Sequence, residues 1–395
     1  MRIAINGCGI AGPALAWWLG EYGYQPVLFE KAPALRTGGY MIDFWGMGYD
    51  IAEKMGVLPA IKEKGYKIEK LKIVGDEGEE KARLDIKAMS SVVDNRFTSV
   101  ARSDVSKALY DACGGIETHF GKHITAVEQT EDYAVVELSD GTREKFDLVI
   151  GADGLHSEVR SAAFGPEENY AQDMGVYVSA YTAEGYQPRE ELAYIMHQGV
   201  KKQVARVSLR YDKTLFLLTF RSELTKSAPR DTKQEKQLLR DVFHDQGWEV
   251  PAILKRMDDT DDFYFDRVSQ IQMDHWSKGR VALLGDAAAC VSLLAGEGTG
   301  LAFVEAYVLA GELRRANGDY KEAFRQYEQR LQEFLKNKQK SARKMVSFFA
   351  PDNGFEMWLM RTVVSALFIP FLSKFLLGTM LRDDVSLPKY DFPGS

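Results

Sequence analysis

Met1-Arg-Ile-Ala-Ile-Asn-Gly-Cys-Gly-Ile-Ala-Gly12 begins the chain with a short apolar strand that runs directly into a glycine-rich turn. In a Gly7-x-Gly9-x-x-Gly12 turn, the first glycine allows the sharp bend and the second lets the backbone approach a pyrophosphate. The third lets the next helix pack on the strand. A helix beginning near Ala11 would direct its free N–H groups toward the phosphates. The sequence therefore predicts a βαβ unit that binds a dinucleotide.

A second apolar segment, Pro26-Val-Leu-Phe-Glu30, supplies the acid that such a unit needs. The Glu30 carboxylate can accept hydrogen bonds from ribose hydroxyls, and Lys31 beside it is a further cofactor-binding candidate. A strand, turn, helix, strand and terminal acid in this order are much more specific than the glycine spacing alone.

The composition favours a folded protein that acts on small molecules. Of 395 residues, 45% are hydrophobic and 27% are charged, a balance typical of soluble globular chains. The net charge of -7 argues against nucleic acid as a partner. Cys8, Cys113 and Cys290 form neither a disulfide framework nor a metal-binding pair, so no metal site is expected. The N-terminus begins a strand rather than a signal peptide, which predicts a cytoplasmic location.

The segment 357–381 is strongly apolar but is interrupted by Arg361, Pro370 and Lys374. Its uncharged part, 362–373, has only 12 residues, whereas a membrane-spanning helix needs about 20. We expect these residues to pack on the body of the protein. Contact with one face of a membrane is the alternative.

The pattern of strands predicts two interleaved domains and a helical tail. Between about 175 and 220 short alternating segments indicate an antiparallel sheet, and buried-type strands at 146–153 and 280–286 flank it. The predicted fold is an α/β Rossmann-like domain, interrupted by an antiparallel-sheet substrate domain and followed by C-terminal helices. The nucleotide-binding domain is assigned to 1–72, 98–172 and 265–310, the sheet domain to 73–97 and 173–264, and the helices to 311–395.

Three helices are predicted more specifically. Residues 47–64 and 102–114 have helical periodicity. A third helix follows Asp231, where Thr232-x-x-Glu235 has the spacing of a capping box.

Three motifs in sequence order resemble the signatures of the single-component FAD-dependent aromatic hydroxylases, typified by para-hydroxybenzoate hydroxylase. They are the N-terminal glycine turn, Gly151-Ala-Asp-Gly-Leu-His-Ser-Glu-Val-Arg160, and Gly279-Arg-Val-Ala-Leu-Leu-Gly-Asp-Ala-Ala288. The likeness covers nearly the whole chain and is greatest for the compact branch that contains the tetracycline-inactivating monooxygenases. It extends to Arg36-Thr-Gly-Gly-Tyr-Met-Ile-Asp43 and to Arg102.

The resemblance implies that the dinucleotide is FAD and that NADPH or NADH is the co-substrate. It places Arg36 on the nicotinamide approach, Asp43, Arg102 and Asp286 against FAD, and Asp153 in a motif that serves both cofactors. Each residue also has a simpler interpretation: a solvated Arg36, a helix-capping Asp43, a surface ion pair of Arg102, or an Asp153 that braces Arg160.

The residues themselves support a cofactor site around Asp286. This carboxylate ends a buried strand at the edge of the sheet where open α/β folds bind ligands. Gly296, Gly298 and Thr299 then open a helix whose N–H groups could stabilise negative charge on the flavin.

The third motif departs from the family pattern. The usual His and following proline are absent after Asp286-Ala-Ala, where Ala289 and Cys290 stand instead. The customary Gln and Asn of the glycine-rich turn are Glu297 and Gly300. A carboxylate at Glu297 should lower the flavin reduction potential unless it points away from the ring.

The leading hypothesis is an FAD-dependent monooxygenase that uses NADPH and O2 to hydroxylate an aromatic or polycyclic small molecule through a flavin C4a-hydroperoxide. No protein nucleophile is required, because the flavin carries the chemistry. Candidates for the substrate wall are Tyr181, His197, Arg206 and Phe216. A monomer or a dimer is expected. Two alternatives remain: an FAD oxidase or dehydrogenase without oxygen transfer, and a non-catalytic, membrane-associated FAD-binding protein.

Overall fold

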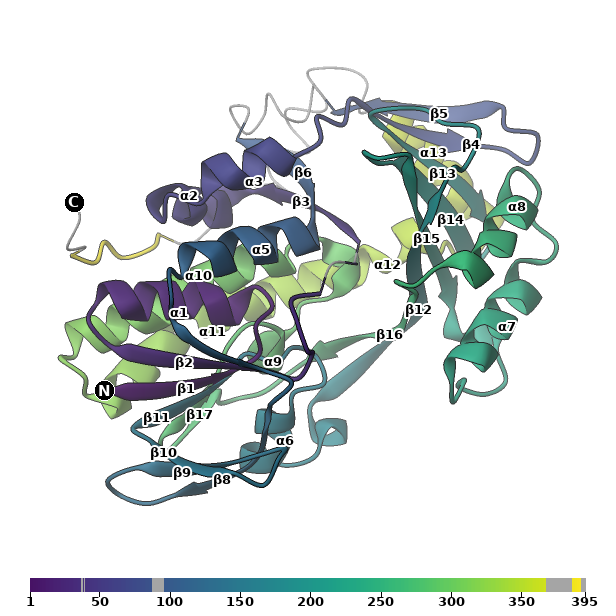
Figure 1. The fold of residues 1–395 in the computed structure, drawn as a ribbon. Coiled ribbons are helices and arrows are strands. Elements are labelled where there is room, and N and C mark those ends of the chain that lie inside the picture. The colour runs from purple at the N-terminus through teal and green to yellow at the C-terminus, as the bar shows by residue number, and fades with distance from the viewer. Residues whose placement is uncertain (37, 39, 87–95, 367–385, 392–395) are drawn as a thin grey trace.

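The computed structural model describes residues 1–36, 38, 40–86, 96–366 and 386–391. It confirms the predicted mixed α/β fold, in which one sheet carries the glycine turn and a second, larger sheet stands beside it (Figure 1). Long helices from the C-terminal half of the chain pack along the first sheet and reach toward the second.

The first sheet has six strands in the order β17-β18-β11-β1-β2-β7. All neighbours are parallel except β17 and β18. The strands are β1 (Arg2–Asn6), β2 (Gln25–Glu30), β7 (Glu117–Phe120), β11 (Leu148–Gly151), β17 (Ser277–Lys278) and β18 (Val281–Leu283). The sequence order reverses at β1, so the carboxyl ends of β1, β11 and β18 meet where such sheets bind their ligands.

Helices cover this sheet because its central strands β1, β2, β11 and β18 are buried on both faces. α1 packs against α10 and α5, and α10 packs against α11 and α2. The helices are α1 (Ala11–Glu21), α2 (Gly46–Lys54), α3 (Leu58–Lys64), α5 (Arg102–Ala112), α6 (Glu158–Phe164), α9 (Asp286–Ala289), α10 (Gly298–Arg315) and α11 (Tyr320–Lys344). An antiparallel sheet of β8 (Ile124–Gln129), β9 (Ala134–Leu138) and β10 (Arg143–Phe146) completes this part.

The second sheet has seven strands in the order β16-β12-β15-β14-β13-β4-β5. They are β4 (Lys70–Val74), β5 (Glu80–Asp85), β12 (Ala171–Glu184), β13 (Ala193–Gly199), β14 (Lys202–Ser208), β15 (Lys213–Arg221) and β16 (Tyr264–Ile271). α7 (Thr232–Phe243) and α8 (Val250–Arg256) cover the face turned away from the first sheet (Figure 1). The domain boundary predicted between residues 72 and 73 therefore falls within β4, and the one between 264 and 265 falls at the start of β16.

A small two-stranded sheet of β3 (Met41–Trp45) and β6 (Phe97–Ala101) leads into α2 and α5. The predicted single helix over 47–64 is wrong, because the chain forms α2 and α3 with Gly56 between them. Gly56 has a φ of +72°, a left-handed conformation that interrupts a right-handed helix.

The predicted capping box also needs correction. α7 is capped by Asp231, whose carboxylate accepts the backbone N–H of Gln234 at 2.8 Å. Thr232 is already the first helical residue.

The last two helices of the described residues are α12 (Val346–Phe349) and α13 (Gly354–Ala366). α13 packs on β5, where Val364 is buried with Ile73 and Leu84. Within the described part of the chain, no helix combines the length and apolarity that crossing a membrane would require. Residues 367–381 of the predicted apolar segment lie outside the described residues.

Candidate cofactor site

At two of the three glycines of the turn, neighbouring backbone atoms lie too close to leave room for a side chain. Gly7 has a φ of +108°, and a Cβ there would lie 2.4 Å from the carbonyl oxygen of Ala152. A Cβ on Gly12 would lie 1.9 Å from the carbonyl oxygen of Gly7. Gly9 differs, since its Cβ position meets only the Arg102 guanidinium, at 3.4 Å. The turn is thus tight against the protein at Gly7 and Gly12 and faces a cationic side chain at Gly9.

The acid at the end of β2 is held beside this turn. One Glu30 oxygen accepts the backbone N–H of Cys8 at 2.9 Å, and the other accepts that of Ala32 at 3.0 Å. Glu30 therefore lies next to the glycine motif, as a ribose-binding carboxylate should. Lys31 is exposed and lies 3.8 Å from Glu158. α1 begins at Ala11, as predicted.

Arg102 and Asp286 bring the first and third motifs together. Arg102 begins α5 beside Gly9, and Asp286 begins α9 after β18. Burial raises the pKa of the Asp286 carboxyl, and the positive charge of Arg102 opposes that rise. A Cβ on Gly298 would lie 3.6 Å from an Asp286 oxygen, so the start of α10 also reaches this point. The starts of α5, α9 and α10 therefore lie around one carboxylate.

Asp43 lies in β3 and does not cap a helix. Its carboxylate accepts the Ser99 hydroxyl at 2.5 Å and the Tyr194 hydroxyl at 3.4 Å. Burial raises the pKa of this carboxyl, and both hydrogen bonds oppose the rise. Because Tyr194 belongs to the second sheet, Asp43 connects that sheet to the cofactor-binding part.

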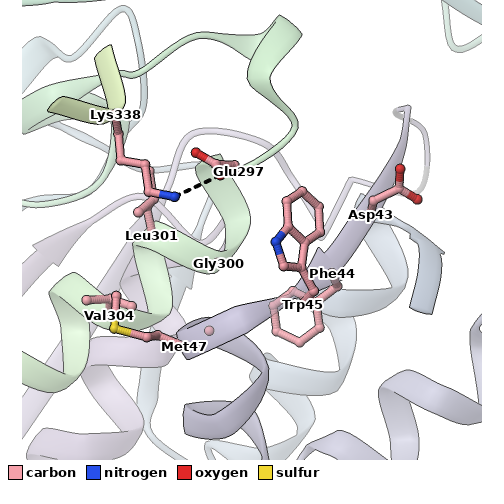
Figure 2. Close-up of a pocket in the computed structure, with 10 residues that line it drawn as sticks. Asp43, Phe44, Trp45, Met47, Glu297, Gly300, Leu301, Val304 and Lys338 are labelled. Atoms are coloured by element: carbon pink, nitrogen blue, oxygen red, sulfur yellow. Dashed lines mark hydrogen bonds and ion pairs between the residues drawn. The ribbon is translucent and has the colours of Figure 1, made fainter. Parts of the chain in front are cut away.

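A small, open pocket lies between β3 and the start of α10 (Figure 2). It is lined by Asp43, Phe44, Trp45, Met47, Gly48, Glu297, Gly300, Leu301, Val304 and Lys338. α2 and α10 approach closely here, because a Cβ on Gly48 would lie 2.4 Å from the Cα of Gly300. The family-atypical Gly300 thus lies at a helix contact.

The other atypical residue, Glu297, is ion-paired. Its carboxylate accepts a hydrogen bond from the Lys338 ammonium of α11 at 2.9 Å. Gly296 ends the short 3-10 helix η4 (Leu293–Ala295) with a φ of +67°, and Gly298 and Thr299 open α10. From the sequence, Glu297 was expected to add an unbalanced negative charge near the flavin. The structure instead pairs its carboxylate with the ammonium of Lys338.

The second motif holds the start of α6 and contacts the third motif. Asp153 accepts the Ser157 hydroxyl at 2.5 Å and the N–H of Glu158 at 2.8 Å, and so holds the start of α6. Arg160 is fully buried and donates to the carbonyl oxygen of Ala287 at 3.1 Å. Each residue thus fixes a different segment, and Arg160 ties the second motif to the third.

Glu305 is a residue that the sequence analysis missed. It is 1% exposed, and its Oε2 accepts the backbone N–H of Gly285 at 2.7 Å and the Tyr327 hydroxyl at 3.0 Å. Burial raises its pKa to about 8. A carboxylate in the otherwise apolar stretch 301–310 was the available signal.

Arg36 is exposed and lies in the connection between β2 and β3, of which Thr37 and Gly39 are outside the described residues. Gly38 of this connection lies against the second domain, because its Cβ position is 2.8 Å from Asp262. The role of Arg36 toward the nicotinamide cofactor stays a prediction.

The substrate-wall candidates share the sheet face that α7 and α8 cover. Phe216 is the direct cross-strand partner of both Tyr181 and Arg206, and His197 follows the same alternation on β13. Tyr181 donates to the carbonyl oxygen of Ile253 on α8 at 2.9 Å, and Arg206 pairs with Glu249 at 2.8 Å. The structure therefore places all four on the face turned away from the third motif.

The opposite face of the sheet meets the third motif. Val176, Val178 and the partly buried Leu217 form a cluster with Leu294 of η4. Tyr194 on the same side contacts Asp43. Neighbouring residues of a strand point to opposite faces of the sheet. The side chains that face the site are therefore those one position before or after the four candidates.

The fold and the converging glycine turn, Arg102 and Asp286 define a dinucleotide-binding α/β protein with a built-in second domain. A family model described as "FAD binding domain" matches residues 1–336, and the chain belongs to this family. FAD fits the two glycines that cannot carry a side chain, the open position at Gly9 and the half-buried Asp286.

Relatives named flavin-dependent monooxygenase support an FAD-dependent oxidoreductase. One from an unknown prokaryotic organism is 38% identical over 86% of this chain and 87% of the relative. Another, from Legionella longbeachae serogroup 1 (strain NSW150), is 37% identical over the same shares.

Two solved structures have nearly the same fold over the full chain. Tetracycline destructase Tet(51) has a TM-score of 0.84 at 32% identity, covering 98% of this chain and 99% of that one. Tet(55) has a TM-score of 0.85 at 30% identity, covering 98% of both chains.

Proposed function

We propose that this FAD-dependent oxidoreductase uses NADPH and O2 to hydroxylate an aromatic or polycyclic small molecule. The observation that carries the proposal is the convergence of Arg102 and Asp286 beside the open Gly9 position, in a chain of the FAD-binding family. FAD, when bound, supplies the chemistry, since it accepts hydride and activates oxygen at its C4a carbon.

The protein residues would bind and orient this cofactor. The backbone at Gly9 would admit the pyrophosphate, with Arg102 supplying positive charge, and Glu30 would accept ribose hydroxyls. Asp286 would accept a hydrogen bond from the ribityl chain. The N–H groups that begin α10 would favour negative charge on the pyrimidine half of the flavin.

NADPH would bind transiently, because only one glycine turn of this kind is present in the sequence and FAD would occupy it. Arg36, which is exposed, is the residue proposed to contact the anionic co-substrate. NADH is the alternative reductant.

We place the proposed substrate near the inner face of the second sheet, which packs against the third motif. Val178, Leu217 and Leu294 are apolar where that face meets the third motif. Two structurally similar proteins are named tetracycline destructases, which makes tetracyclines the first compounds to test.

The test combines three measurements on purified, FAD-loaded protein with a panel of tetracyclines, phenols and quinones. Flavin bleaching by NADPH under nitrogen measures reduction, peroxide assays measure uncoupling, and mass spectrometry with isotopically labelled dioxygen measures oxygen transfer. We expect one labelled oxygen atom in the product of at least one compound, with faster reduction when that compound is bound.

Flavin that stays oxidised throughout the panel would contradict the proposal. Rapid reduction with stoichiometric peroxide and no labelled product would instead support an oxidase. The absence of the usual proline after Asp286 is the feature that favours that second candidate.

A further inference from the structure

We propose that the second sheet carries a binding site of its own, for a small organic ammonium compound with an apolar ring and an oxygen acceptor. The site is a cavity of about 420 Å³ that is open to solvent. Small-molecule pockets typically measure about 300–1,000 Å³. All residues that line the cavity belong to this sheet or to the connections beside it. The inference therefore does not depend on the proposed flavin chemistry.

The cavity lies on the face of the sheet that α7 and α8 cover, between the β4–β5 turn and the start of α8 (Figure 1 shows these elements). The Trp248 N–H donates to the carbonyl oxygen of Asp76 in that turn at 2.5 Å. A Cβ on Gly78 of the same turn would lie 3.6 Å from the Trp248 indole. The turn and the indole therefore form one connected wall.

The inner part of the cavity is apolar. Val74 and Ile195 are 5% and 3% exposed, and they belong to a buried cluster on which Trp248 packs. Aliphatic groups beside an indole favour a ligand with an apolar ring. The face of an indole also attracts a cation.

A buried donor in the cavity wall lacks an acceptor. Arg206 is 4% exposed, its Nη2 donates to Glu249 Oε1 at 3.0 Å, and its Nε lies 2.8 Å from Oε2. Its Nη1 has no hydrogen-bond partner among the described residues. A buried N–H group without an acceptor costs free energy. An oxygen of the ligand would supply the acceptor, so we assign Arg206 to this cavity rather than to the substrate wall.

Acidic side chains outnumber basic ones around the cavity. Five acids and two bases line it, and both bases are already paired. Arg206 pairs with Glu249, and Lys72 lies 2.6 Å from Glu190. Two of the five carboxylates therefore have a close cation.

The other three carboxylates lack a close cation of this kind. Glu80 lies 4.0 Å from Lys72, and Glu77 forms no ion pair with another described residue. Asp76 lies 3.4 Å from His197, whose pKa is lowered by burial. This excess of negative charge beside an indole favours a ligand that carries an ammonium group.

The experiment titrates the FAD-loaded protein with four related compounds by isothermal calorimetry. Phenylalaninol has a phenyl ring, an ammonium and a hydroxyl. Phenethylamine lacks the hydroxyl, hydrocinnamyl alcohol lacks the ammonium, and hydrocinnamate has a carboxylate instead. We expect phenylalaninol to bind with one molecule per chain. Loss of the ammonium should weaken binding by about tenfold or more. Phenethylamine should bind more weakly than phenylalaninol, and hydrocinnamate should bind most weakly.

Variants locate the site on the protein. Trp248→Leu and the double variant Asp76→Asn/Glu77→Gln should each weaken phenylalaninol binding by about tenfold or more. Trp358→Leu is the matched control, because Trp358 is 59% exposed on α13 and does not line the cavity. It should bind phenylalaninol like the wild type. FAD content and melting temperature, measured on each protein, show that the variants are folded.

An absence of saturable phenylalaninol binding would overturn the inference. Wild-type affinity in both Trp248→Leu and the double variant would also overturn it, because the ligand would then lie elsewhere. If Trp248→Leu does not fold, the double variant decides. Equal affinity for phenylalaninol and hydrocinnamate would refute the charge preference. None of these results bears on the proposed flavin chemistry, which oxygen transfer tests separately.

Discussion

The Glu305 carboxylate of α10 accepts the backbone N–H of Gly285 at 2.7 Å, one residue before Asp286. Gly285 has a φ of +65° and ends the turn that follows β18. The single proton of the Tyr327 hydroxyl is shared between the same Glu305 oxygen, at 3.0 Å, and the carbonyl oxygen of Leu283, at 3.2 Å. Glu305 and Tyr327 thus fix both sides of the turn that presents Asp286 to the cofactor site.

Replacing Glu305 with Ala should destabilise the protein by about 1–3 kcal/mol. The change leaves the buried N–H of Gly285 without an acceptor, whereas the Tyr327 hydroxyl keeps the carbonyl oxygen of Leu283. Glu305→Gln should cost less than about 1 kcal/mol, because the amide oxygen can accept both hydrogen bonds. Urea unfolding measures both values. Equal losses in the two variants would show that the hydrogen bonds to Glu305 do not support the turn.

The same carboxyl predicts a pH-dependent stability. Burial raises the pKa of Glu305 from its ordinary 4.5 to about 8. Between these values the folded protein holds a proton that the unfolded chain has lost, so this group's contribution to stability falls as the pH rises. Glu305→Gln cannot titrate. The difference in free energy of unfolding, variant minus wild type, should therefore rise by more than about 1 kcal/mol between pH 5.5 and pH 8.5. A constant difference across that range would contradict the assignment.

Valine substitutions should separate folding from binding in the glycine turn. Gly12→Val should not give a stable protein, because even a Cβ would lie 1.9 Å from the Gly7 carbonyl oxygen. Gly9→Val should fold, since its Cβ position meets only the end of the flexible Arg102 side chain at 3.4 Å. It should nonetheless lose FAD, because the side chain blocks the pyrophosphate. Thermal unfolding and flavin fluorescence measure the two effects, and full FAD affinity in Gly9→Val would refute this site.

Asp286→Ala should weaken FAD binding by about 0.5–1.5 kcal/mol, or about 2- to 13-fold, because one hydrogen bond to the neutral ribityl chain is lost. Asp286→Asn is the matched control, since its amide oxygen can still accept that hydrogen bond. Fluorescence titration of apoprotein with FAD measures both. An Asp286→Ala protein with wild-type affinity would place the ribityl chain elsewhere.

The sequence by itself determined the cofactor class and much of the fold. Gly7, Gly9 and Gly12 are informative because their chemistry is local, as each is required by atoms of its own turn or by the phosphate that approaches it. The three motifs in order predicted the FAD-binding family, and the strand patterns predicted the second sheet. Helix boundaries were less accurate, because a left-handed residue such as Gly56 interrupts a pattern that remains helical on both sides.

Only the tertiary structure decided which side chains face the site and which charges are neutralised. All seven residues of β14 are buried, because the sheet is covered on both faces, so no polar and apolar alternation remains to show where Arg206 points. The pairing of Glu297 with Lys338 depends on how α11 lies against α10, and the bond from Glu305 to Gly285 depends on how α10 crosses the end of β18. Such contacts join elements 20 to 41 residues apart, and the packing of whole helices determines them rather than the residues beside them in the chain.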